Sequence, residues 1–347
     1  MAEIVTFGCR LNAYESEVLK EKLKNIDNLI VINTCAVTGE AERQCRQAIR
    51  KLRRENPSAK IVVTGCSAQI SSSKIAQMPE VDLILGNKEK KEIEKYVADF
   101  TGSSTSKKFV EDIQEDTACD DFMITGFEGR HKAFLQIQQG CNHRCTYCII
   151  PYARGSNRSV PLPLITQQIK KLLAQGFKEI CLTGVDICSY EPSFSGVVKD
   201  ILEQIPELPK LQFGSLDPAA IDDDFINLLS QHSNIDSHFH FSIQSGDNLI
   251  LKRMGRRHCR ETVIDLCRKI REKRPEATFG ADFICGFPTE SIEAFENTCK
   301  LVSEAGISKL HVFPYSEREG TPAARMPQIP MEERRRRAAV LRKLSKE

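Results

Sequence analysis

This chain of 347 residues has 14 cysteines, and six of them are spaced so that their thiolates could bind iron. The segment GCNHRCTYCIIPYARG places Cys141, Cys145 and Cys148 in a C-x3-C-x2-C pattern. Three thiolates in one loop can bind three irons of a four-iron cluster and leave the fourth iron open for chemistry. A structural zinc site commonly has two C-x2-C pairs, and the sequence has no second pair. We therefore predict an iron–sulfur cluster here rather than zinc or unligated buried thiols.

Three further cysteines each follow a predicted strand, in the segments TFGC (Cys9), INTC (Cys35) and VTGC (Cys66). The carboxyl ends of parallel strands lie on one edge of a sheet, so these thiols can converge. Gly8 and Gly65 would allow a tight turn before the thiol. The pattern predicts a second three-thiolate site, with three unrelated core cysteines as the alternative.

The elements that position these thiols follow from hydrophobic periodicity. Short apolar runs predict strands at 4–7, 29–33, 60–64 and 83–85, and longer periodic stretches predict helices at 13–25, 40–56 and 88–99. This alternation is typical of a parallel, doubly wound α/β sheet of Rossmann or flavodoxin type. We expect it to form an N-terminal domain over residues 1–99.

Residues 100–126 are rich in Ser, Thr and acidic side chains and predict a linker. A second domain is expected over 127–330. Its predicted strands are 134–138, 179–183, 211–215, 238–243, 278–285 and 309–313, and its predicted helices include 164–176, 194–205, 261–273 and 291–305. Six β/α units are too few for an eight-unit barrel, so we predict a partial (β/α)6 barrel. Residues 331–347 predict one basic helix.

Charge and hydropathy indicate a globular cytoplasmic protein. Lys plus Arg number 49 and Asp plus Glu 47, and no apolar run approaches the ~20 residues of a membrane span. The start MAEIVTFGC lacks the pattern of a secretory signal. Disulfides are not expected in a reducing compartment. The other eight cysteines share no spacing, and we expect most of them to be buried.

With their flanking residues, both cysteine sets resemble those of the radical S-adenosylmethionine (SAM) methylthiotransferases. The loop matches the C-x3-C-x-aromatic-C signature, with Tyr147 as the aromatic residue. The resemblance covers nearly the whole chain and includes GCRLNAYESE, VINTCAVTGEAER, VTGCSAQ, SLDP, SIQSGDNLILKRMGR, ICGFPTE and HVFPYSEREGTPA. The stretch NTCAVTGEAER is most similar to the branch that modifies threonylcarbamoyladenosine beside the tRNA anticodon.

This resemblance implies SAM and two [4Fe-4S] clusters. Cys9, Cys35 and Cys66 match the auxiliary-cluster ligands, and residues 141, 145 and 148 match those of the radical cluster. The implied reaction adds a methylthio group to C2 of the adenine. The alternatives are isopentenyladenosine in tRNA or a ribosomal protein as substrate, and, from another class, a non-catalytic iron–sulfur electron carrier or redox sensor.

Residues expected to contact SAM lie near the barrel strand ends, and no catalytic residue is expected beyond the cluster ligands. They are Tyr147, Gly184, Ser215, Asp217, Gln244, Gly286, Phe287, His311 and Phe313. Such enzymes also need an electron donor, for which flavodoxin or ferredoxin is expected, and a sulfur donor that the sequence does not identify.

Local basic segments suit a phosphate backbone, with solvated helix faces as the alternative, and the resemblance implies that the RNA is a tRNA anticodon stem-loop. The residues expected to contact RNA are Arg144, Arg154, Arg158, Arg253, Arg256 and Arg257. An arginine near the cluster, Arg154 or Arg158, could pair with the substrate's threonyl carboxylate. The family usually ends in a small RNA-binding β-barrel, and we expect that domain to be absent from this chain.

Overall fold

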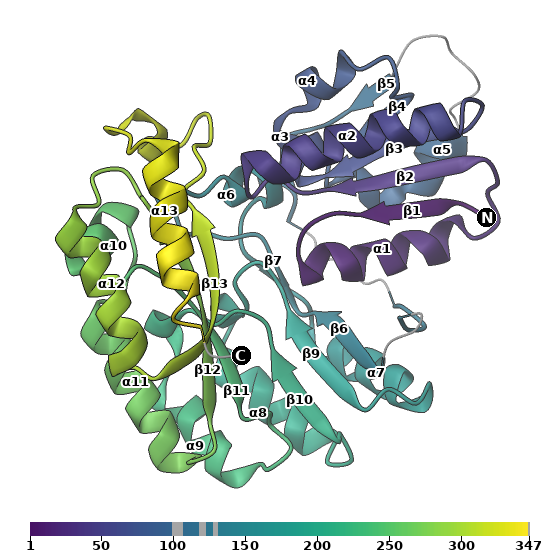
Figure 1. Ribbon diagram of the computed structural model, residues 1–347. Coiled ribbons are helices and arrows are strands. Elements are labelled where there is room, and N and C mark those ends of the chain that lie inside the picture. Colours follow the sequence, from purple (N-terminus) through teal and green to yellow (C-terminus); the bar gives the residue numbers. More distant parts are fainter. Residues whose placement is uncertain (99–106, 118–122, 128–130, 346–347) are drawn as a thin grey trace. The chain divides into compact units, whose positions relative to one another are not determined.

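The computed structural model describes residues 1–98, 107–117, 123–127 and 131–345, and Figure 1 shows its elements. The described residues form two compact units, and each is treated by itself below. The first unit comprises Met1–Asn142, Ile149–Phe177 and Thr183–Val185. The second unit comprises His143–Cys148, Lys178–Leu182 and Asp186–Glu347.

A five-stranded parallel sheet organises the first unit, in the order β1-β2-β3-β4-β5. Its strands are β1 (Glu3–Thr6), β2 (Leu29–Thr34), β3 (Lys60–Gly65), β4 (Leu83–Leu85) and β5 (Lys107–Phe109). The helices between them are α1 (Arg10–Leu23), α2 (Gly39–Glu55), α3 (Cys66–Ile70), α4 (Ser72–Ala76), the 3-10 turn η1 (Glu89–Glu92) and α5 (Ile93–Ala98).

Alternate side chains of the strands point to opposite faces, so the sheet has two apolar layers. One layer packs against α2 and α3 through Ile32, Ile49, Ile61, Val63 and Ala68. The other packs against α1 and α5 through Leu19, Val31, Val62, Leu83 and Val97. None of the cysteines belongs to either described layer, so the hydrophobic effect holds the sheet together without them.

The predicted parallel α/β sheet is confirmed, with strand ends within one residue of their predicted positions. Within the predicted helix 88–99, the first turn is η1 and Asp99 lies outside the described residues. The stretch expected to be a linker, 100–126, contains β5 and the 3-10 turn η2 (Ile113–Glu115); 100–106 and 118–122 lie outside the described residues. A three-residue edge strand, KKF, is too short to show a period of two.

All six strands predicted for the barrel are present. They are β6 (Lys132–Gln136), β9 (Glu179–Thr183), β10 (Lys210–Phe213), β11 (His238–Gln244), β12 (Thr278–Cys285) and β13 (Ile307–Pro314). In the second unit β9 pairs with β10, and β11, β12 and β13 form a parallel sheet. Bridges between Leu211 and Ile235 and between Leu216 and Phe241 join the two groups.

Helices of the second unit alternate with these strands, as the β/α pattern requires (Figure 1). They are α8 (Phe194–Gln204), α9 (Asp223–Gln231), α10 (Asn248–Met254), α11 (Arg260–Lys273), α12 (Ile292–Glu304) and α13 (Met331–Arg342), with 3-10 turns η3 (Ile187–Ser189), η4 (Pro218–Ala220) and η5 (Pro322–Arg325). The first unit also holds the antiparallel pair β7 (Gln138–Gln139) and β8 (Arg158–Ser159), α6 (Ile150–Arg154) and α7 (Leu162–Ala174).

The predicted basic C-terminal helix is confirmed as α13, although it ends at Arg342 rather than at the last residue. Two of its arginines are buried. Arg337 pairs with Glu290 at 2.7 Å, and Arg334 donates a hydrogen bond to the backbone oxygen of Tyr315 at 3.0 Å. Part of the positive charge of this helix therefore stabilises the second unit. No helix in the described part of the chain is both long and apolar enough to cross a membrane.

Candidate functional site

Cys9, Cys35 and Cys66 lie at the predicted edge of the sheet in the first unit. Cys9 caps the start of α1, Cys35 follows β2 directly, and Cys66 follows β3 as the first residue of α3. Burial, together with the neighbouring Cys66 and Cys9 thiols, raises the pKa of the Cys35 thiol to about 12. The strand order thus brings the three sulfur atoms close enough to interact.

Two glycines permit this approach. Gly8 has a φ of +104°, and a Cβ at this position would lie 3.0 Å from Sγ of Cys35. Gly65 has a φ of +93°, and a Cβ there would lie 2.5 Å from the backbone oxygen of Thr34. A side chain would be strained at these φ values and would have no room, so only glycine fits directly before Cys9 and directly before Cys66.

A buried ionic network lies against Cys66 in the same unit. Nε of Arg154 is 3.1 Å from Sγ of Cys66, and the guanidinium also pairs with Glu15 and donates to Oδ1 of Asn12 at 2.5 Å. Nζ of Lys90 lies 2.7 Å from the Glu15 carboxylate. Burial alone would raise the pKa of Glu15, but Arg154 and Lys90 outweigh it and hold that pKa well below its usual range.

The charge of this network suits an anionic group at the thiols. Arg154, Lys90 and Glu15 are 2, 5 and 5% exposed, so two buried cations share one carboxylate. Uncompensated buried charge is costly. Thiolates at Cys9, Cys35 and Cys66, which are the form that binds iron, would supply the missing negative charge. The residues present therefore fit a metal cluster held by these three sulfurs.

Cys141, Cys145 and Cys148 lie between β7 and α6. In the second unit, Thr146 anchors this segment. Its amide donates to the backbone oxygen of Met254 at 2.9 Å, and its backbone oxygen accepts from the amide of Ala323 at 2.9 Å. The amide of Cys148 donates to the backbone oxygen of Cys145 at 3.0 Å, which folds the last part of the segment into a turn.

Arg256 lies beside Cys145 in the second unit. Its guanidinium is 3.8 Å from Sγ of Cys145 and 3.0 Å from the buried carboxylate of Asp217, which also pairs with Arg257 at 2.9 Å. Nε of Arg256 is buried and has no hydrogen-bond partner among the described residues. A buried donor without a partner is costly. This orphaned donor beside a thiol fits an anionic cofactor or cluster at Cys145.

Tyr147 packs against an apolar cluster of the second unit that includes Met254, Phe287 and Tyr315. Phe287 is fully buried and meets Tyr315 edge to face, with ring centroids 5.6 Å apart. The structure thus joins two residues that the sequence linked to SAM, and it gives Phe287 a packing role in that cluster.

Three neighbouring strands contribute a polar cluster in which the sequence analysis named Ser215 and His311 but missed Asp282 and His240. Asp282 on β12 accepts from His240 on β11 at 3.0 Å, from His311 on β13 at 3.3 Å and from Ser215 at 3.0 Å. Burial favours the neutral acid, but the two imidazoles outweigh it and hold the pKa of Asp282 well below its usual range. The imidazole and carboxylate atoms lie within 4.8 Å of one another, a set that could also bind a metal ion. An acid inside the apolar run 278–285 was the visible sign of this cluster.

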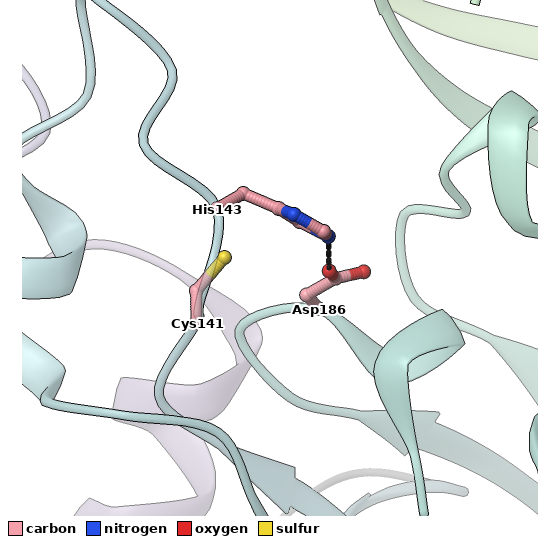
Figure 2. Close-up of side chains that lie close together, drawn as sticks. All are labelled: Cys141, His143 and Asp186. Carbon is pink, nitrogen blue, oxygen red and sulfur yellow. Dashed lines mark ion pairs between the residues drawn. The ribbon is translucent and has the colours of Figure 1, made fainter. Parts of the chain in front are cut away.

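Another histidine pairs with a carboxylate in the second unit. Figure 2 shows His143 pointing toward Asp186, with Nε2 of the ring 3.0 Å from Oδ2 of the carboxylate. Ser189 donates to the same oxygen at 2.6 Å. His143 lies between the first two cysteines of the loop, so this pair anchors the loop toward the turn after β9.

The remaining predicted SAM contacts occupy the expected strand ends. Gly184 follows β9 in the first unit. In the second unit, Gln244 ends β11 with a φ of 75° and Gly286 follows β12 with a φ of 70°. Phe313 on β13 is 42% exposed. Ser215 and His311 both contact Asp282, whereas Asp217 binds arginines.

The arginines predicted to contact RNA differ in exposure. Arg144, Arg253 and Arg257 are exposed. The Arg256 side chain is 8% exposed. Arg154 and Arg158 are buried and bind within the first unit, because Arg158 pairs with Asp116 at 3.3 Å as Arg154 pairs with Glu15.

Most of the eight other cysteines are buried, as predicted. Five of them are buried and two are partly exposed, while Cys119 lies outside the described residues. The buried ones are Cys45, Cys181, Cys188, Cys267 and Cys285, and the partly exposed ones are Cys259 and Cys299.

Comparison with known proteins defines the class first. A model of the radical SAM superfamily matches residues 135–302, and a model described as uncharacterized protein family UPF0004 matches residues 1–86. The fold is similar to that of the radical SAM methyltransferase TsrM from Kitasatospora setae, with a TM-score of 0.65 at 13% identity, over 93% of this chain and 77% of that chain. The chain therefore has a radical SAM fold.

Two curated relatives then define the family. The chain is 50% identical to threonylcarbamoyladenosine tRNA methylthiotransferase MtaB of Rickettsia prowazekii (strain Madrid E), over 98% of this chain and 82% of the relative. It is 34% identical to tRNA-2-methylthio-N(6)-dimethylallyladenosine synthase of Carboxydothermus hydrogenoformans (strain ATCC BAA-161 / DSM 6008 / Z-2901), over 96% and 80%. The chain belongs to the radical SAM methylthiotransferase family, whose cofactors are SAM and two [4Fe-4S] clusters.

Proposed function

We propose that this protein adds a methylthio group to C2 of the adenine in threonylcarbamoyladenosine, next to the anticodon of a tRNA. The observation that carries this proposal is the 50% identity to a threonylcarbamoyladenosine tRNA methylthiotransferase over 98% of the chain. Identity to the dimethylallyladenosine synthase is lower, at 34%, so the prenylated base is the weaker alternative.

The two cysteine triplets are proposed as the cluster ligands. Cys9, Cys35 and Cys66 would hold the auxiliary cluster, and the loop from Cys141 to Cys148 would hold the radical cluster. When bound, SAM and the clusters supply a methyl group, a sulfur atom and a carbon-centred radical. A radical is required because acid–base catalysis cannot activate the aromatic C–H bond of adenine.

The chain's own residues position these groups. Tyr147, which lies between Cys145 and Cys148, packs on an apolar cluster of the second unit, which fixes this part of the loop. Arg256 donates toward Cys145 and is fixed by Asp217, so its charge stays in place. At the strand ends, Gln244 and Gly286 have left-handed backbone conformations that turn the chain directly after β11 and β12.

Recognition of RNA is proposed for the exposed arginines, Arg144, Arg253 and Arg257. Exposed guanidinium groups can bind phosphate, although Arg257 also pairs with the buried carboxylate of Asp217 at 2.9 Å. Arg154 and Arg158 are not included, because their guanidinium groups are buried in internal ion pairs. The target base must be extruded from its stack to react, which costs a few kcal/mol.

The remaining parts of the proposal concern partners and boundaries. We propose flavodoxin or ferredoxin as the electron donor and the cytoplasm as the location, in line with tRNA-modifying relatives. The proposed domains are the auxiliary-cluster domain, residues 1–99, with its sheet extended by β5 from the linker 100–126, the barrel, residues 127–330, and the basic helix, residues 331–347.

Nucleoside mass spectrometry of tRNA tests the proposed substrate. Cells that lack this protein should lose methylthio-threonylcarbamoyladenosine, and the intact gene should restore it, whereas a gene encoding Cys145→Ala should not. Loss of the prenylated methylthio nucleoside instead would select the alternative substrate. If tRNA nucleosides are the same in cells with and without the protein, and the purified protein still binds iron, an electron carrier or redox sensor is favoured.

A further inference from the structure

Arg154 is close to the loop cysteines in the sequence and close to Cys66 in the folded first unit. It ends α6, six residues after Cys148, yet its Nε lies 3.1 Å from Sγ of Cys66. The guanidinium is fixed on its other edge by Glu15 and Asn12. The Arg154 side chain is 3% exposed, so these partners hold it in the interior of the first unit.

The charges around Arg154 favour a negative charge at the hydrogen bond between Arg154 and Cys66. Among the described residues, Glu15 is the carboxylate that pairs with both Arg154 and Lys90, and Gln139, Asn12 and Asn87 add only neutral dipoles to this group. One positive charge therefore remains uncompensated in a buried site, and Cys66 is the neighbour that receives the Arg154 hydrogen bond. A [4Fe-4S] cluster held by three thiolates carries net negative charge, which grows when the cluster is reduced.

We propose that Arg154 is a positioning residue for the auxiliary cluster: its guanidinium fixes Cys66 and raises the reduction potential of that cluster. This inference rests on the proposed assignment of Cys9, Cys35 and Cys66 as ligands. Hydrogen bonds to ligand sulfurs and nearby positive charge favour the reduced, more negative form of a cluster. Arg154 thus acts on the auxiliary cluster rather than on the threonyl carboxylate of the substrate.

Arg158 provides a matched control. It lies four residues after Arg154, is also buried, and pairs with Asp116 as Arg154 pairs with Glu15. Among the described residues, its partners are the Asp116 carboxylate and the backbone oxygens of residues 116, 154 and 156, and none of them is a cysteine. Replacing Arg158 therefore removes a buried arginine without removing a hydrogen bond to a thiol.

The test is a redox titration, followed by electron paramagnetic resonance, of the reconstituted full chain with both clusters. A full chain with the three loop cysteines replaced by alanine identifies the auxiliary signal. Arg154→Met should shift the auxiliary potential to a more negative value, and Arg154→Lys, which keeps the charge but not the guanidinium geometry, should shift it less. Arg158→Met should leave the reduction potential of the auxiliary cluster unchanged.

Iron content separates this inference from the ligand assignment. If replacing Cys9, Cys35 and Cys66 by alanine removes no iron, the assignment fails and the inference falls with it. If the cluster is present and Arg154→Met leaves its potential unchanged, or Arg158→Met shifts it equally, the role of Arg154 is refuted. If Arg154→Met loses auxiliary iron, retention in both Arg154→Lys and Arg158→Met supports the role, and loss in Arg158→Met refutes it.

Discussion

The first unit takes its three thiols from three strand ends, whereas the other triplet lies within one loop. The strand-end triplet exists only when β1, β2 and β3 pair in register. The loop triplet has its spacing built into the local chain, and backbone hydrogen bonds from Thr146 fix the segment. One site thus depends on the order of strands in a sheet, and the other depends on the anchoring of a short segment.

Both sites nevertheless contain the same arrangement of charges. Each has an arginine beside one cysteine, 3.1 Å for Arg154 and 3.8 Å for Arg256, and each arginine binds a buried carboxylate. Each carboxylate, Glu15 or Asp217, also binds a second cation. The second cation is the difference, because Lys90 is buried whereas the Arg257 side chain is 46% exposed.

Replacing either cysteine triplet by alanine should have the largest effect and should separate the two sites. Each triple variant should lose about half of about eight irons and all methylthio product. Only the chain that retains the loop cysteines should still cleave SAM to 5′-deoxyadenosine. Anaerobic iron and sulfide analysis and chromatography of the nucleoside products measure both. Equal loss of 5′-deoxyadenosine in the two variants would contradict separate roles for the triplets.

Replacing the carboxylates tests whether the shared charge arrangement is equally important in both units. Glu15→Gln and Asp217→Asn each leave a buried arginine without its anion, so each should lower the free energy of unfolding by about 3 kcal/mol. Urea unfolding followed by circular dichroism gives the values. Asp265→Asn, on an exposed helix surface beside Arg268, is the control and should change stability by less than about 0.5 kcal/mol. If only one of the two substitutions lowered the free energy of unfolding, the charge arrangement would not be equally important in both units.

Acidification provides a milder version of the same comparison. The folded pKa values of Glu15 and Asp217 lie well below the ordinary carboxyl value of about 4. Their stabilisation is therefore complete above about pH 4 and is lost as the pH falls toward the folded pKa values. The urea concentration at the unfolding midpoint of the metal-free chain should decrease as the pH is lowered below about 4. This decrease should be less steep in Glu15→Gln and Asp217→Asn. Parallel curves for the variants and the unaltered chain would contradict this assignment.

The smallest expected effect concerns an exposed arginine near the loop. Arg253→Gln removes one cation without breaking a buried ion pair, so the slope of log affinity for tRNA against log salt concentration should fall by about one. Filter binding at several salt concentrations measures this slope. Arg268→Gln, on the exposed surface of α11 beside Glu272, should leave the slope unchanged. The same change in both variants would show that the effect is not local.

The sequence was sufficient where a repeating rule applied. Periodicity located the parallel strands, and the rule that their carboxyl ends share an edge placed Cys9, Cys35 and Cys66 together. The partners of Arg154 had no such rule, because Glu15 and Lys90 come from α1 and η1 and meet it only in the folded unit. The RNA prediction for Arg154 and Arg158 counted charge without knowing burial, which only packing determines.

The two apolar layers of the sheet have a consequence for the supply of iron. Since Cys9, Cys35 and Cys66 contribute to neither described layer, the sheet has its stabilising core before any metal arrives. We therefore expect the sheet of the first unit to stay folded in the metal-free chain, so that iron is needed for the cluster and not for the sheet.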